Sequence, residues 1–143
     1  MDAKRTSVAL LVGGAVLWGT GYLIFNVLFD DFYAANAGSA SGVDRDAQLL
    51  WAAALGELAY AGLIIFAIGN RTGVLSIGKG AVIGAVVGFL LWFHVDFLFY
   101  GGTNLANLTR TIVDPLLEFV HGGLGGVAIA VTLRMLPGTD RAA

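Results

Sequence analysis

The sequence predicts an all-α membrane protein: a bundle of four transmembrane helices forming a single domain over residues 1–143. Hydrophobic residues make up 57% of the chain and charged residues only 13%, and the mean hydropathy is +0.81. A water-soluble domain of this size has too little interior to bury so much apolar surface. The few charged residues also leave four long apolar runs, each able to cross a hydrocarbon core of about 30 Å.

Composition excludes several other classes of protein. A disordered chain needs low hydrophobicity and high charge, which is the opposite of what is found. The net charge of -2 and the isoelectric point near 5.5 exclude a basic nucleic-acid binder. The absence of cysteine excludes disulfides and thiolate metal sites.

The first three predicted spans are plain apolar runs. Residues 7–29 carry no charge, and residues 49–69 carry only Glu57. Residues 80–100 carry His94 and Asp96 near their end. At a rise of about 1.5 Å per residue, each run is long enough to cross a bilayer.

Charged residues interrupt the start of the fourth span, where Arg110, Asp114 and Glu118 precede a clean apolar stretch. A residue before proline avoids the helical region, whereas proline itself suits the first helical position. We therefore expect this span to cover residues 115–136, beginning at Pro115 with Asp114 as its N-cap. The alternative is one kinked helix from Leu105 onward.

The positions of the cations predict the orientation of the bundle. By the positive-inside rule, both termini are cytoplasmic, and the connections over residues 30–48 and 101–114 lie outside. One side of the four spans carries Lys4, Arg5, Arg71, Lys79, Arg134 and Arg141, whereas the other carries only Arg45 and Arg110.

Glycines at four-residue spacing predict close helix contacts, because small residues let backbones approach within a bilayer. Gly80, Gly84 and Gly88 recur on the third span, and Gly122 and Gly126 on the fourth. One interpretation is packing inside the bundle, and the other is a homodimer seam along Gly80, Gly84 and Gly88. Either contact would leave the outer half of the third span free to splay and form a cavity.

Ionisable residues of three spans fall at similar depths in the outer half of the bundle. Counting residues places Glu57 and His94 about 12 Å deep, Asp96 about 9 Å, Glu118 about 5 Å and His121 about 10 Å. Such residues are costly in a membrane and mark functional sites by default. The predicted ligand- or ion-binding residues are Glu57, His94, Asp96, Arg110, Asp114, Glu118 and His121.

Helical geometry divides these residues by face. Asp114, Glu118 and His121 follow a spacing that lines one side of the fourth span, and this side should face the bundle because lipid cannot solvate it. His94 and Asp96 lie about 200° apart around the third span and cannot both face one point.

Three explanations remain open for the polar cluster. It is a network of satisfied pairs, for instance with Arg110 closing over Asp114 or Glu118; or it is a binding or conduction site with the carboxylates and histidines as relay groups. The third explanation is a metal centre, because Glu118 and His121 have the Glu-x-x-His form of di-iron bundles. The candidate metal ligands are Glu118, His121, Glu57 and His94. No cofactor is firmly implied, and no catalytic triad or nucleotide motif argues for an enzyme.

Several short motifs are shared with one family: Trp18-Gly19, Asp31-Phe32-Tyr33, residues 103–108 and Val113-Asp114. In these the chain resembles a family of small bacterial four-span membrane proteins classified only as a domain of unknown function. Family members carry an acidic residue where Leu17 stands, and a tryptophan-glycine pair shortly after the last-span aspartate. The resemblance implies a fold and a location in the bacterial cytoplasmic membrane, and no activity.

The sequence therefore predicts an integral membrane protein that binds or translocates an ion, a proton or a small polar solute through an outward-opening polar cavity. The expected partners are the lipid bilayer and a second copy of the chain, and nucleic acid is not among them. An accessory subunit of a larger membrane complex is the alternative, and a metal-dependent membrane enzyme is the third hypothesis.

Overall fold

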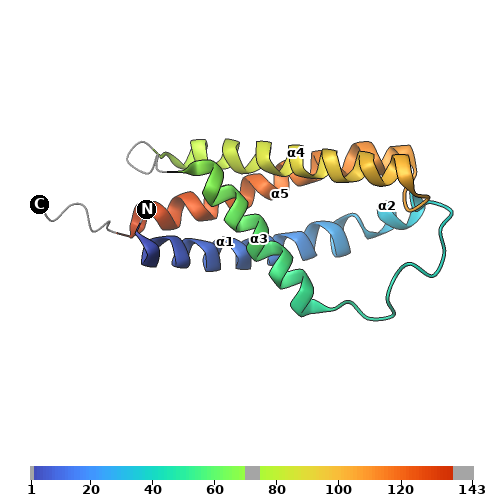
Figure 1. The fold of residues 1–143 in the computed structure, drawn as a ribbon, viewed down its shortest axis with the longest axis horizontal. Coiled ribbons are helices and arrows are strands. Elements are labelled where there is room, and N and C mark those ends of the chain that lie inside the picture. The colour runs from blue at the N-terminus through green and yellow to red at the C-terminus, as the bar shows by residue number, and fades with distance from the viewer. Residues whose placement is uncertain (1, 70–74, 137–143) are drawn as a thin grey trace, which may run out of the picture.

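The computed structural model describes residues 2–69 and 75–136, and these residues are mainly α-helical (Figure 1). Asp2 caps the first helix, where its side chain accepts a hydrogen bond from the backbone N–H of Lys4. Arg71 and Arg141, which contribute to the predicted orientation, lie outside the described residues. The helical elements are α1 (Ala3–Leu23), the π-helical turn η1 (Ile24–Leu28), α2 (Asp30–Ala35), α3 (Leu50–Ile68), α4 (Ile77–Gly102) and α5 (Leu108–Met135).

Four helices are long and apolar enough to cross a membrane, which confirms the predicted four spans. The first is α1 continued by η1, over Ala3–Leu28, and the others are α3, α4 and α5. The predicted limits 7–29, 49–69 and 80–100 agree with the first three helices to within a few residues. The chain is thus a multi-pass integral membrane protein.

The predicted start of the fourth span is wrong, and the single longer helix is correct. Helix α5 begins at Leu108, where the side chain of Asn107 caps it by accepting a hydrogen bond from the backbone N–H of Arg110 at 3.0 Å. Pro115 lies buried inside the helix. Proline has no N–H to bond to the carbonyl of Thr111, and its ring crowds that carbonyl, yet the helix capped by Asn107 continues through Pro115. Asp114 is therefore a residue of the helix and not its cap.

Helices α4 and α5 lie side by side along a seam of glycines (Figure 1). A Cβ atom added at Gly84 would collide with the carbonyl of Gly122, and one added at Gly80 would meet the carbonyl of Gly126. A Cβ atom at Gly88 would collide with the carbonyl of Glu118. The glycines therefore pack inside the bundle, as the first interpretation has it. The homodimer seam predicted along Gly80, Gly84 and Gly88 is wrong, because α5 of the same chain covers that face.

Large side chains of α1 and α5 fill the space over glycines of their neighbours. A Cβ atom at Gly125 of α5 would lie 2.5 Å from Leu17 of α1, and one at Gly13 of α1 would lie 2.5 Å from Ile129 of α5. This packing of a large side chain on a glycine brings α1 and α5 close together at both positions. The buried core around it consists of Ala9, Leu17, Tyr60, Ala61, Ile64, Ile65, Ile68, Leu75, Ile129, Ala130 and Leu133.

Helix α3 crosses the bundle obliquely and joins the core only through its second half (Figure 1). Its buried residues run from Tyr60 to Ile68, whereas Leu50, Trp51 and Leu55 in its first half are exposed. We call the end of the bundle that holds α2 and the first turns of α3 and α5 the α2 end. At the opposite end, Arg5 of α1 donates a hydrogen bond to the carbonyl of Leu133 of α5.

The chain beyond α2 is fastened to the loop between α4 and α5 by a set of hydrogen bonds. The side-chain amide of Asn107 donates to Oδ1 of Asn36 at 3.1 Å, and the backbone N–H of Asn107 donates to the carbonyl of Asn36 at 3.2 Å. The N–H of Gly38 donates to the carbonyl of Leu105, next to a β-bridge between Ala37 and Ala106. We call this set the Asn36–Asn107 clasp. It holds α2 across the end of the bundle.

Candidate functional site

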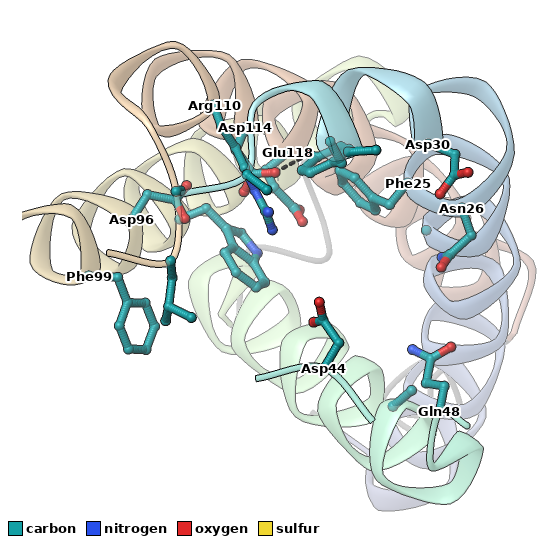
Figure 2. Close-up of a pocket in the computed structure, with 18 of the residues that line it drawn as sticks. Phe25, Asn26, Asp30, Asp44, Gln48, Asp96, Phe99, Arg110, Asp114 and Glu118 are labelled. Carbon is teal, nitrogen blue, oxygen red and sulfur yellow. Dashed lines mark hydrogen bonds between the residues drawn. The ribbon is translucent and has the colours of Figure 1, made fainter. Parts of the chain in front are cut away.

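A cavity of about 900 Å³ opens at the α2 end, where α3 diverges from the other helices (Figure 2). Every helical element contributes to its wall, as does the segment between α2 and α3, from which Asp44 and Gln48 line it. A cavity is thus present at this end, but the helix that diverges is α3, whereas the predicted splaying of the third span is wrong because α4 stays beside α5 (Figure 1). Its charged lining residues are Asp30, Asp44, Glu57, Asp96, Asp114, Glu118 and Arg110.

The charge of this lining is strongly one-sided. Six carboxylates face a single guanidinium, that of Arg110, among the lining residues. Figure 2 shows the labelled acids distributed around the cavity rather than gathered at one point. Walls of low dielectric focus the field of such charges, so the cavity attracts positive charge and repels anions.

Aromatic rings form much of the rest of the wall. The guanidinium of Arg110 lies 4.8 Å from the ring centroid of Tyr33, a distance at which a cation is attracted to the face of the ring. One ring of the wall therefore already accepts a cation supplied by the protein itself. The aromatic lining residues are Trp18, Tyr22, Phe25, Tyr33, Trp92 and Phe99.

Tyr33 of α2 donates a hydrogen bond from its hydroxyl to Oδ1 of Asp114 on α5. Asp114 is only 8% exposed, so this bond satisfies a carboxylate that has little access to water. Burial, and then the neighbouring Asp114 carboxylate, raise the pKa of Tyr33 well above its ordinary value. The phenol therefore stays protonated and remains a hydrogen-bond donor.

Glu118 and His121, one turn apart on α5, form a buried pair. Nδ1 of His121 lies 2.9 Å from Oε2 of Glu118, and the two residues are 1% and 4% exposed. Nε2 of His121 lies 2.9 Å from the carbonyl oxygen of Leu17 on α1. Gly21 makes this approach possible, because a Cβ atom there would lie 3.2 Å from the imidazole ring. Both nitrogens of His121 are thus engaged.

Glu57 reaches the same place from α3. A Cβ atom at Gly21 would lie 3.6 Å from Oε1 of Glu57, so this carboxylate and the imidazole of His121 meet over one glycine. Oε2 of Glu57 is buried and has no hydrogen-bond partner among the described residues. Nε1 of Trp92 and Oδ2 of Asp96 are also buried without a hydrogen-bond partner among the described residues. Both residues line the cavity. Buried polar groups normally have partners, so these three atoms are available to a bound solute or water.

A π-helical turn forms part of the wall on the α1 side. In η1 the N–H of Phe29 donates to the carbonyl of Ile24, five residues earlier, at 3.0 Å. The turn carries Asn26, an exposed lining residue whose amide is drawn at the cavity in Figure 2. Single π-helical turns occur frequently at functional sites, because they shift the side chains that follow them.

The structure brings together six of the seven predicted site residues. Glu57, Asp96, Arg110, Asp114 and Glu118 line the cavity, and His121 lies behind Glu118. His94 does not join them, because it is exposed on another face of α4 and is not a lining residue. The 200° separation from Asp96 that follows from helical geometry accounts for this, since α4 turns Asp96 toward the cavity.

Two of the predicted roles are not found. The expected pairing of Arg110 with Asp114 or Glu118 is replaced by the contact of its guanidinium with the Tyr33 ring, and the ion pair seen in the described chain is that of Glu118 with His121. No group of three histidine or acidic side chains suited to a metal ion occurs within residues 2–69 and 75–136. Because both nitrogens of His121 are engaged, we do not identify these residues as metal ligands.

Sequence reasoning missed several lining residues. Tyr33 belongs to the motif Asp31-Phe32-Tyr33, but only the folding of α2 across the end of the bundle places its hydroxyl against Asp114. Asp30 and Asp44 lie in the predicted outer connection over residues 30–48, yet they line the cavity. The cluster of acidic residues after the first span was the one available signal.

Comparison of the chain with protein-family models, with curated proteins and with solved structures finds no match. Of the resemblance to the small four-span family, the four long apolar helices are what the structure supports.

Proposed function

We propose that this protein binds and translocates a small organic cation, such as an ammonium compound, through the cavity at the α2 end. The observation that carries the proposal is the excess of acidic side chains around one cavity, where five carboxylates besides the paired Glu118 lie against one guanidinium. Ionisable residues inside membrane proteins face one another or a polar pathway, because lipid does not solvate them. A positively charged solute would reduce the mutual repulsion of these carboxylates.

An organic cation suits the cavity better than a bare metal ion does. A cavity of about 900 Å³ lies within the range of small-molecule sites, and its carboxylates are spread around the wall. Trp18 and Trp92 line the same cavity as the carboxylates, and aromatic faces attract ammonium groups. Carboxylates and aromatic rings together can thus surround an ammonium compound.

The distribution of charges along the sequence favours a cavity that faces outward. The described cations Lys4, Arg5, Lys79 and Arg134 lie near the helix ends opposite the cavity, and this end is cytoplasmic by the positive-inside rule. The bacterial cytoplasmic membrane is the location proposed here. A solute would then enter from the outer side.

Binding of tetramethylammonium to the purified protein in lipid nanodiscs tests the proposal. We expect Glu57→Gln and Glu118→Gln each to weaken binding at least tenfold, or about 1.4 kcal/mol. Asp31→Asn is the matched control, because Asp31 is exposed on α2 and does not line the cavity. In proteoliposomes, uptake of the same compound should follow the same order of variants.

Unchanged binding and uptake in both glutamine variants would contradict the proposal. If the protein also copurified with a stable membrane partner, the alternative of an accessory subunit would be favoured.

A further inference from the structure

The hydrogen bonds of His121 determine which of its nitrogens carries a proton. Nε2 lies 2.9 Å from the carbonyl oxygen of Leu17. A carbonyl oxygen can only accept a hydrogen bond, so Nε2 must carry the hydrogen and donate it. The other nitrogen, Nδ1, is therefore protonated only when the ring is positively charged.

The second bond of His121 needs one more proton. Nδ1 lies 2.9 Å from Oε2 of Glu118. A carboxylate oxygen and a bare ring nitrogen both present lone pairs, and they form a hydrogen bond only with a proton between them. Either Glu118 carries that proton and is neutral, or His121 carries it and the two charges cancel. The pair is electrically neutral in both forms and holds exchangeable hydrogen.

We propose that Glu118 and His121 form a proton-binding site and that this site gives up its shared proton when a monovalent cation occupies the cavity. The proton site follows from the two hydrogen bonds alone, whereas its coupling to a cation rests on the proposed function. One proton leaves as one positive charge arrives, so charge is balanced and no further reactant is needed. The pair is left with a carboxylate and a neutral imidazole.

The groups around the pair account for the direction of this exchange. Helix α3 contributes Glu57 and Tyr60, α4 contributes Asp96, and α2 contributes Tyr33. Helix α5 itself adds Asp114 and Arg110, and the residues of α1 at this level bring no charge. The excess of carboxylates keeps the shared proton in place. A cation bound among these carboxylates supplies the same positive charge. The proton shared by Glu118 and His121 is then held less strongly and is released.

The position of Glu118 gives the proton a route. Glu118 lines the cavity, and Figure 2 shows its carboxylate turned toward it, whereas His121 lies behind and is only 1% exposed. Aromatic rings of Phe25 and Tyr60 pack edge-on against the imidazole at 5.5 and 5.7 Å between centroids. These rings close off the histidine, so the proton reaches the cavity through Glu118.

The chain offers a clean measurement, because it contains only two histidines and His94 is exposed outside the cavity. His94→Gln leaves His121 as the single histidine, and ¹⁵N-histidine NMR in nanodiscs then reports both of its nitrogens. We expect Nε2 to carry hydrogen at every pH and the Nδ1 signal to be that of a shared proton at neutral pH. A ring with hydrogen on Nδ1 and a bare Nε2 would overturn the proposed proton site.

Two further variants in the His94→Gln background test the role of Glu118. Glu118→Gln removes the shared proton but keeps a donor for Nδ1, so the Nδ1 signal should become that of a bare nitrogen at neutral pH. Asp96→Asn changes a carboxylate of the same cavity that does not bond to His121, and the shared proton should persist. An Nδ1 signal that is the same with and without the Glu118 carboxylate would overturn the proposal. The tautomer measured in His94→Gln alone decides the matter if Glu118→Gln fails to fold.

Proton release on addition of tetramethylammonium chloride tests the coupling, with a pH-sensitive dye in weakly buffered nanodiscs. We expect about one proton per bound cation in His94→Gln and none in the double variant with Glu118→Gln. Binding without proton release would overturn the coupling and leave the proposed function standing. A shared Nδ1 proton in a protein that binds no tetramethylammonium would contradict the proposed function and the coupling, and leave the proton site standing.

Discussion

The hydroxyl of Tyr33 donates a hydrogen bond to Asp114, although 81 residues separate the two in the chain. This bond joins the short helix α2 to α5 at the point where both line the cavity. Arg110, one turn before Asp114, lies over the same tyrosine ring. One aromatic side chain thus contacts a buried acid through its hydroxyl and a base through its face.

Removing this hydroxyl should destabilise the protein. Tyr33→Phe leaves the carboxylate of Asp114 buried without its donor, at a cost of about 1–3 kcal/mol. Thermal unfolding in detergent measures the effect. Tyr22→Phe is the matched control and should change little, because Tyr22 is exposed and no hydrogen bond of its hydroxyl is seen in the described chain. Equal melting temperatures for the two variants would contradict the importance of the bond.

The same tyrosine predicts a loss of stability in alkali. Burial and Asp114 raise the pKa of Tyr33 in the folded protein, whereas the unfolded chain ionises at the ordinary value of 10.0. Above pH 10 the folded state therefore binds more protons than the unfolded state, and its stability falls as the pH rises. Melting temperature measured from pH 8 to 11 should decline more steeply for the wild type than for Tyr33→Phe. Parallel curves would refute this prediction.

The two histidines should respond differently to replacement. His121→Leu leaves Glu118 buried without its partner and should destabilise the protein by about 3–5 kcal/mol. His94→Leu changes an exposed residue of α4 and should alter stability by no more than about 0.5 kcal/mol. Unfolding of both variants in the same detergent tests the contrast. It would be contradicted by a larger loss in His94→Leu.

The glycine seam predicts a positional effect along α4. Gly84→Ala places a methyl group against the carbonyl of Gly122 and should cost about 1–3 kcal/mol through overpacking. Gly78→Ala on the same helix meets no atom within 4 Å and should be neutral or slightly stabilising. The comparison uses the melting temperatures of the two variants. Tolerance of alanine at Gly84 would mean that the helices are farther apart than described.

The Asn36–Asn107 clasp can be tested by a double-mutant cycle. Asn107→Ala removes the N-cap of α5 and the bond to Asn36, and it should cost about 1–3 kcal/mol in total. Asn36→Ala removes this bond and the bond from the Asn36 amide to the carbonyl of Phe32 but leaves the cap, so it should also cost about 1–3 kcal/mol. The double variant should lose less than the sum of the two. Strict additivity of the melting data would show that the two side chains do not interact.

The four spans were predictable from the sequence because a bilayer requires long uncharged runs, and those of residues 7–29, 49–69 and 80–100 have clear limits. The start of α5 could not be predicted in the same way, because proline is typical of the first position of a helix. Pro115 instead lies within a helix capped by Asn107. The preference of proline for the first helical position is a local rule. It does not take account of the cap that Asn107 provides two turns earlier, where α5 begins.

The candidate site was predictable in part, because the predicted spans fix the depth of each ionisable residue. Glu57, Glu118 and His121 could be placed at a common depth by counting residues along their helices. The part of the wall formed by α2 could not be predicted. The position of α2 across the bundle depends on hydrogen bonds between residues far apart in the chain, such as Asn36 and Asn107. His94 shows the limit of depth alone, since depth does not say which face of a helix a residue occupies.

The glycine seam has a mechanical consequence for the cavity. Helices held together by backbone contacts, as α4 and α5 are at Gly84 and Gly122, have no side chains between them that could change rotamer. Helix α1 is locked to the same pair through Leu17 and Gly125. The first half of α3 has no buried residue and lies apart from the other helices, so the angle of α3 to them sets the width of the cavity. If the proposed solute is bound there, we expect the cavity to open and close by a pivot of α3 about its second half, near Ala61 and Ile64, which are fully buried.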